Sequence, residues 1–127
     1  MIAISPTRVT IAAALLFAVS APLAFGQATG KFSDGVLVND AGMTLYSFDN
    51  DASGKSVCNG ACATNWPPLT ASAGATASGD WSIITRDDGT RQWAYKGKPL
   101  YTWSKDQKPG DRTGDGFLNN QWHVVKP

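Results

Sequence analysis

Two cysteines and a single histidine are the residues of this sequence whose types could support redox or metal chemistry. Cys58 and Cys62 are separated by three residues, and His123 stands near the C-terminus. In an oxidising compartment, two cysteines so close together favour a local disulfide. Alternatively, two thiolates and an imidazole could hold a soft ion such as Cu(I), as in a periplasmic metal-binding or electron-transfer accessory protein. The spacing does not fit the Cys-x-x-Cys of thioredoxin-like catalysis.

Two segments rich in Asp and Gly have the residue types that bind calcium. Residues 49–54 supply side-chain oxygens at positions one, three and five and a glycine at position six, like the start of an EF-hand loop. Position twelve is Gly60 where an EF-hand has Glu, and residues 111–116 form a second such segment. Asp and Gly are also ordinary turn residues, because Asp caps the backbone and Gly accepts positive φ. Weak calcium binding is therefore an alternative to a structural role.

An enzyme has little support in the sequence. The chain contains one His and no Glu, and no Ser stands in a Gly-x-Ser-x-Gly context. A formal net charge of +1 argues against a nucleic-acid-binding surface. We therefore expect a non-enzymatic binding or structural module without a cofactor, with copper and calcium as the alternatives.

The first 26 residues have the pattern of a secretory signal peptide. Arg8 precedes an apolar run from Val9 to Val19, and small residues flank Phe25 before a cut at Gly26. The apolar run is about half of the ~20 residues needed to span a bilayer, which favours cleavage over anchoring. No cysteine follows the run as a site for acylation. We expect residues 27–127 to form one domain, periplasmic or secreted and monomeric, with no membrane span.

One motif occurs twice in this domain, in residues 42–51 and again 55 positions later in residues 97–106. Gly, Leu, Tyr and Asp recur at identical offsets, and an aromatic residue follows each Tyr two positions later. Self-similarity of this kind indicates two copies of one supersecondary unit, at about 33–69 and 86–125. The motif residues are Tyr46, Phe48 and Asp51 in the first copy and Tyr101, Trp103 and Asp106 in the second.

Period-two alternation predicts strands at both motif copies, residues 45–48 and 100–103. Each follows a Gly-containing turn and an apolar strand, so each copy should contain a β-hairpin. Further strands are expected at 81–85 and 122–125, with a helical turn at 61–65 and a surface connection at 70–79. The expected fold is mainly β: a small antiparallel domain of about six strands, built from two similar hairpin-containing halves.

The strand pattern also assigns structural roles to the motif side chains. Alternation puts the motif aromatics on one strand face, toward the core. A carboxylate at Asp51 or Asp106 would accept hydrogen bonds from backbone amides in the following loop and so hold the hairpin end. Trp66, just before Pro67 and Pro68, should pack against the loop that the two cysteines close.

These residues carry a family resemblance. The Tyr-x-(Phe/Trp/Tyr)-x-x-Asp motif, the stretch from Cys58 to Pro68 and the tail from Pro109 to His123 resemble the bacterial secreted-repeat lipoproteins that bear this motif. That family is largely uncharacterised, so the resemblance implies an exported cell-envelope protein of unknown function. An envelope protein or a glycan is the partner we expect. Membrane anchoring is not implied, because the chain lacks the acylated cysteine.

Overall fold

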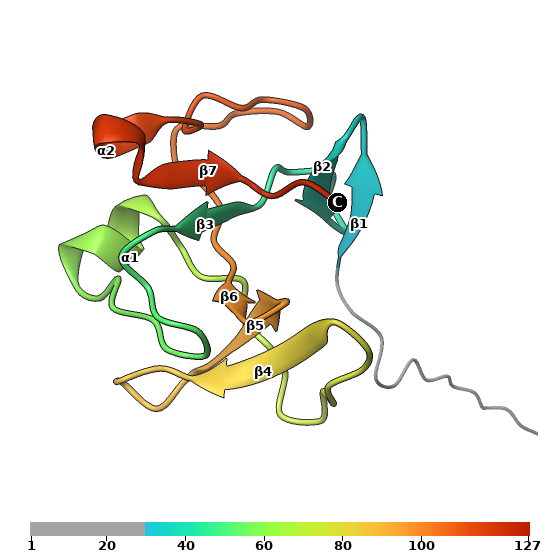
Figure 1. Cartoon of the computed structure of the whole chain (residues 1–127), viewed down its shortest axis with the longest axis vertical. Coiled ribbons are helices and arrows are strands. Elements are labelled where there is room, and N and C mark those ends of the chain that lie inside the picture. The colour runs from blue at the N-terminus through green and yellow to red at the C-terminus, as the bar shows by residue number, and fades with distance from the viewer. Residues whose placement is uncertain (1–29) are drawn as a thin grey trace, which may run out of the picture.

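The computed structural model describes residues 30–127, and the predicted signal peptide lies outside the described residues. This part of the chain is mainly β, with seven strands and two short helices (Figure 1). In chain order the elements are β1 (Gly30–Ser33), β2 (Val36–Asn39), β3 (Tyr46–Phe48), α1 (Ala61–Asn65), β4 (Trp81–Thr85), β5 (Arg91–Tyr95), β6 (Lys98–Pro99), α2 (Phe117–Asn120) and β7 (Trp122–Val124). Among residues 30–127, no helix has the length and hydropathy that a membrane crossing requires.

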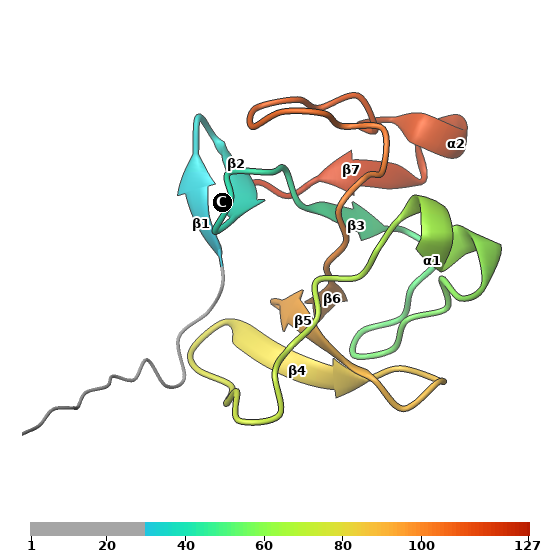
Figure 2. The same ribbon diagram turned by 180° about the vertical axis from the view of Figure 1, so that it is seen from behind.

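All strand pairs are antiparallel, and they form three small sheets: β1-β2, β3-β7 and β4-β5-β6. Each half of the chain opens with a hairpin, β1-β2 in the first and β4-β5 in the second, and Figure 2 shows the β1-β2 hairpin above the β4-β5 hairpin. The mainly β fold with two similar halves is therefore confirmed, with the helical turn at α1. The predicted hairpin of the first copy is different, because β2 pairs with β1 and β3 with β7, and only an isolated bridge joins Val38 to Thr44. Strand β1 was not predicted, because its residues after Gly30 are exposed and give no apolar alternation.

The second motif copy differs from its predicted strand. Residues 100–103 make ladder contacts at Tyr101 alone, as isolated bridges to Tyr46 and Pro68. The backbone amides of this segment donate to different partners: Leu100 to the Trp93 carbonyl, Tyr101 to Tyr46 and Thr102 to Pro67. A segment whose hydrogen bonds go to several neighbours crosses those neighbours and does not form a regular ladder with any of them.

The core consists of two apolar clusters that share the motif strands. Leu45 and Leu100 belong to one cluster, and the adjacent Tyr46 and Tyr101 belong to the other. Strand β2 divides in the same way, so it is buried on both faces. Successive residues of a strand point to opposite faces, and the Leu-Tyr pair of each copy therefore joins the two clusters.

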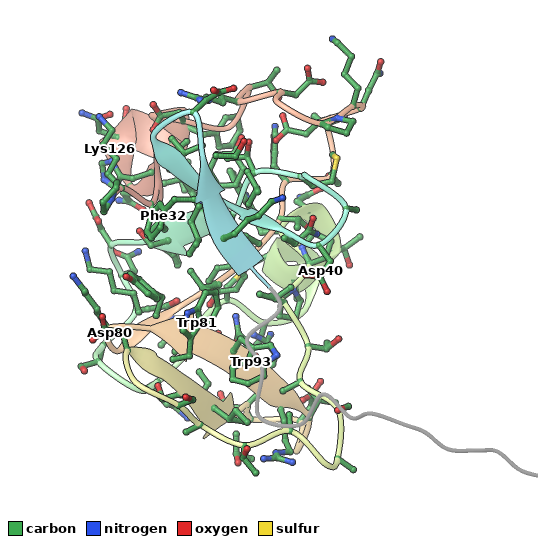
Figure 3. The ribbon with its side chains drawn as sticks, turned by 90° about the vertical axis from the view of Figure 1, so that its right-hand side faces the viewer. Phe32, Asp40, Asp80, Trp81, Trp93 and Lys126 are labelled. Atoms are coloured by element: carbon green, nitrogen blue, oxygen red, sulfur yellow. A yellow bond between two sulfur atoms is a disulfide. The ribbon has the colours of Figure 1, made fainter. Side chains whose placement is uncertain are left out.

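The second cluster is closed on one side by aromatic rings from β4 and β5. Trp81 and Trp93 lie below β1 in Figure 3, with their ring centroids 5.9 Å apart and edge to face. Phe32 of β1 meets Tyr95 edge-on at 5.7 Å. The Phe32–Tyr95 contact joins the first hairpin to the second half of the chain.

Candidate functional site

The tyrosines and aspartates of the two motif copies bind one another crosswise. Tyr46 donates its hydroxyl proton to Asp106 Oδ2 at 2.7 Å, and Tyr101 donates to Asp51 Oδ2 at 2.6 Å. The backbones of the two tyrosines also pair with each other. Tyr46 N donates to Tyr101 O at 2.8 Å, and Tyr101 N donates to Tyr46 O at 3.0 Å. Both tyrosines are fully buried. The tyrosine of each copy is thus held by the aspartate of the other.

The second oxygen of each aspartate holds the loop that follows it. Asp51 Oδ1 accepts a hydrogen bond from Val57 N at 2.8 Å. Asp106 Oδ1 accepts from Thr113 N at 3.0 Å and from the Thr113 hydroxyl at 2.6 Å. These backbone amides are the kind of partner that the sequence predicted. The crosswise tyrosines were missed, since equal offsets in two copies do not say whether Tyr and Asp pair within a copy or between copies.

Burial changes the acidity of this group of side chains. The pKa values of Tyr46 and Tyr101 are raised, first by loss of water and then by the hydrogen bond to a carboxylate. The pKa of Asp51 is also raised by burial, against the lowering effect of the Tyr101 and Val57 hydrogen bonds. Both phenols therefore keep their protons at neutral pH.

A buried arginine that belongs to neither motif copy extends this network. Arg86 is 4% exposed and donates to Ser56 Oγ (2.9 Å), Gln92 Oε1 (2.8 Å), Cys58 O (2.5 Å) and Asn59 Oδ1 (3.3 Å). Ser56 Oγ lies 2.5 Å from the Tyr101 hydroxyl, so a chain of hydrogen bonds joins Arg86 to Asp51. Arg86 stands before Asp87, Asp88 and Gly89 in the sequence, where a charge is ordinarily solvated.

The two cysteines form a disulfide, with a sulfur–sulfur distance of 2.05 Å. Neither sulfur is then a thiolate that could bind Cu(I). His123 lies elsewhere, with Nε2 2.8 Å from Asp49 Oδ2. In the described part of the chain, no cluster of three or more His, Cys, Asp or Glu side chains is placed to hold a metal ion. The structure does not bring Cys58, Cys62 and His123 together.

The aspartates of the calcium-like segments bind groups of the protein itself. Asp111 Oδ2 accepts from the backbone amides of Gln107 (2.9 Å) and Lys108 (3.2 Å), which lower its pKa together with the Lys108 ammonium. Asp115 Oδ1 accepts from Val124 N at 3.1 Å. Asp111 thus caps its own turn and Asp115 ties its loop to β7, which is the structural alternative to calcium binding.

The motif aromatics and two further tryptophans form a column of stacked rings. Trp66 lies between Trp103 (centroids 3.9 Å apart, planes at 28°) and Trp122 (3.8 Å, 2°), and Phe48 stacks on the far side of Trp122 (4.2 Å, 11°). Trp66 belongs to the same cluster as Cys58 and Cys62. Its role in joining the aromatics of both copies could not be predicted from residue types.

A cavity of about 250 Å³ opens where the loop after the first motif meets the β5-β6 turn. Its lining residues are Ser47, Phe48, Asp49, Asp51, Ala52, Ser53 and residues 96–99. The corresponding place in the other copy has a cavity of about 270 Å³, where Gly42 and Thr44 take the positions of Gly97 and Pro99. That second cavity has Lys31 and Arg112 in its lining but no aromatic ring.

Comparison with known proteins agrees with this twofold arrangement. A family model described as a secreted repeat of unknown function matches residues 28–70 and again residues 82–126. Each matched segment contains one Tyr–Asp motif copy. No curated protein and no solved structure matches the chain. Since the two matches cover more than half of its residues, the chain belongs to this family of secreted repeats of unknown function.

Proposed function

We propose that this protein is an exported, non-enzymatic module that binds an acidic glycan of the cell envelope in the cavity beside Phe48. The motif side chains with acid–base chemistry are buried and bonded to one another, which supports a structural role for the motif. The family's description as secreted supports the export. The composition of the cavity is the observation that carries the proposal.

The cavity offers what a charged sugar ring requires. Phe48 is partly buried and supplies an apolar ring surface, while Ser53 supplies a hydroxyl group. The two carboxylates of the lining already have partners within the protein, Asp51 in Tyr101 and Val57 and Asp49 in His123. Lys96 and Lys98 add two ammonium groups, and within residues 30–127 neither forms an ion pair. A volume of about 250 Å³ lies below the roughly 300–1,000 Å³ of sites for drug-sized ligands, which suits one sugar residue of a longer chain.

The test is an NMR titration of the secreted protein with soluble muropeptides, which carry carboxylates, and with neutral chito-oligosaccharides of equal length. We expect the amide shifts around residues 47–53 and 96–99 to move with the acidic ligand and to move less with the neutral one. Lys98→Ala should weaken binding about two- to fivefold, the effect of losing one exposed charge contact. Phe48→Leu should weaken it about tenfold through loss of the ring surface.

The second cavity provides the matched control. Lys31→Ala removes a lysine from the counterpart cavity and should leave the affinity unchanged. Tryptophan fluorescence of each variant checks that the fold is retained. Equal weakening by Lys31→Ala and Lys98→Ala would contradict this site, and the absence of shifts with either glycan would contradict glycan binding and leave a protein partner as the replacement.

A further inference from the structure

We propose that the stacked tryptophans and the two buried tyrosines act as a relay for an oxidising equivalent. A one-electron oxidant at the surface removes an electron from the column Trp103–Trp66–Trp122. The oxidised indole then takes an electron from Tyr46 or Tyr101. That tyrosine releases its phenol proton to the aspartate it already binds. The activity is scavenging of strong one-electron oxidants, and the resulting radical resides on one of these two tyrosines.

The geometry of the three indoles favours removal of an electron from them. Their centroids are 3.9 Å and 3.8 Å apart, and the planes of Trp66 and Trp122 differ by 2°. Two aromatic faces that oppose each other in this way place negative electron density on negative density, which is the less favourable arrangement for neutral rings. A positive charge on one ring is stabilised by the faces of its neighbours, by the attraction that acts in cation–π contacts.

Each buried tyrosine is placed to give an electron to an oxidised indole and a proton to a carboxylate. Tyr46 meets Trp66 edge-on at 5.3 Å, and Tyr101 meets Trp122 edge-on at 5.1 Å. Each hydroxyl already donates to a carboxylate oxygen, at 2.7 Å and 2.6 Å. An oxidised phenol is a strong acid, so its proton transfers along the existing hydrogen bond without movement of the heavy atoms.

The step balances in electrons, protons and charge. The oxidant gains one electron, the tyrosine O–H bond breaks, and a new O–H bond forms at Asp106 Oδ2 or Asp51 Oδ2. A neutral phenol and a carboxylate become a neutral tyrosyl radical and a neutral carboxylic acid, so the buried pair loses its negative charge. An external one-electron reductant, such as a thiolate or ascorbate, returns the electron and the proton goes back to the phenol oxygen.

The column reaches the surface at both ends. Phe48 stacks on Trp122 at 4.2 Å and lines the cavity of about 250 Å³, so one phenyl ring separates the indole from a molecule in that cavity. At the other end Phe117 is 44% exposed and lies 4.8 Å from Trp103. Oxidants can therefore approach the column while the indoles themselves stay at most 7% exposed.

The chain contains a matched control set outside the column. Trp81 meets Trp93 and Tyr95 edge-on, at 5.9 Å and 5.2 Å, without face-to-face stacking. Among the described residues, the Tyr95 hydroxyl donates no hydrogen bond to a carboxylate, unlike those of Tyr46 and Tyr101. Two tryptophans and one tyrosine thus share the residue types of the column but lack its geometry.

The test is flash oxidation of the whole protein by a photoexcited ruthenium tris(bipyridine) complex with persulfate as electron acceptor, followed by transient absorption and electron paramagnetic resonance. We expect an indole radical that converts into a tyrosyl radical, more slowly in D2O because a proton moves. Trp66→Phe should lower the tyrosyl yield several-fold, and Trp81→Phe and Tyr95→Phe should leave it unchanged.

The aspartate variants keep the test decisive if Trp66→Phe fails to fold. The double variant Asp51→Asn/Asp106→Asn keeps all the rings and removes both proton acceptors, so the indole radical should persist and the tyrosyl signal should disappear. Near-ultraviolet circular dichroism checks that the rings remain stacked. A tyrosyl yield that is unchanged in this variant, or that falls equally in Trp66→Phe and Trp81→Phe, overturns the proposal.

Discussion

Each motif aspartate uses its two oxygens for two different tasks. Asp51 Oδ2 accepts from Tyr101 of the other copy, and Asp51 Oδ1 accepts from Val57 in its own following loop. A carboxylate suits this position because it carries acceptors only and can serve two donors at once. The motif therefore specifies the contact between the copies and the shape of each loop with the same side chain.

Tyr101→Phe should destabilise the fold, because it removes the donor to the half-buried Asp51 carboxylate and the hydrogen-bond partner of the fully buried Ser56 hydroxyl. The expected loss in the free energy of unfolding is roughly 1–3 kcal/mol, the cost of an unsatisfied buried polar group. Urea unfolding measures this loss in Tyr101→Phe. The control is Tyr95→Phe, which removes a hydroxyl that takes no part in the crosswise hydrogen bonds. Equal stability of the two variants would show that the crosswise hydrogen bonds contribute nothing in particular.

The two buried phenols also predict the response of stability to alkaline pH. Their pKa values are raised in the folded state, so the unfolded chain loses these protons near pH 10 while the folded chain keeps them. The free energy of unfolding should therefore hold below about pH 10 and then fall, by up to roughly 1.4 kcal/mol per pH unit for each tyrosine. Urea unfolding across this range should show a shallower fall in Tyr46→Phe and the shallowest in the double variant with Tyr101→Phe. An unchanged slope contradicts the raised pKa values.

At the scale of the elements, the sequence predicted what local signals determine. The strand at residues 81–85 was predicted from its local pattern, and Asp87, Asp88 and Gly89 lie in the turn that joins it to β5. The pairing of β3 with β7 joins Tyr46 to Val124, and no local pattern encodes a partner so distant in the chain. The site divides in the same way: the motif residues and the disulfide pair were found from sequence, but the crosswise bonds and Arg86 were not. Arg86 was missed because an arginine followed by two aspartates looks the same in the sequence whether it is buried or exposed.

The β5-β6 turn shows how closely one copy fits against the other. Gly97 has φ +82°, and a Cβ there would lie 2.6 Å from Ser53 Oγ in the loop after the first motif. Gly97→Ala should therefore cost the roughly 1–2 kcal/mol of a left-handed alanine plus the cost of that clash. Gly89→Ala, with φ +88° and open space around the new Cβ, reports the backbone cost alone. In urea unfolding, the added Ser53→Ala substitution should bring Gly97→Ala to the level of Gly89→Ala. If the added substitution does not restore stability, contact with Ser53 is not the cause of the extra destabilisation in Gly97→Ala.

At the scale of the whole molecule, neither copy can complete its own core. The ring of Trp66 from the first copy lies between Trp103 and Trp122 of the second, and β3 finds its strand partner in β7. The tyrosine hydroxyl of each copy has its acceptor in the other. Figure 1 shows the consequence, with β3 from the first copy and β7 from the second side by side in one layer. The pair of repeats is therefore the smallest unit that buries these groups.

The two copies should consequently fold together and not alone. Residues 28–70 and 82–126, prepared as separate peptides, should each lack the near-ultraviolet circular dichroism of stacked indoles, because no two neighbouring rings of the column come from the same copy. A protease site inserted between Thr76 and Ala77, which are exposed in the connection between the copies, provides the control. After cleavage there the two fragments should stay associated and keep the signal, since the contacts between the copies do not depend on that peptide bond. A separate copy that shows the native signal would mean that the crosswise bonds join two independent folds, and the motif would then be a contact between domains instead of the centre of one.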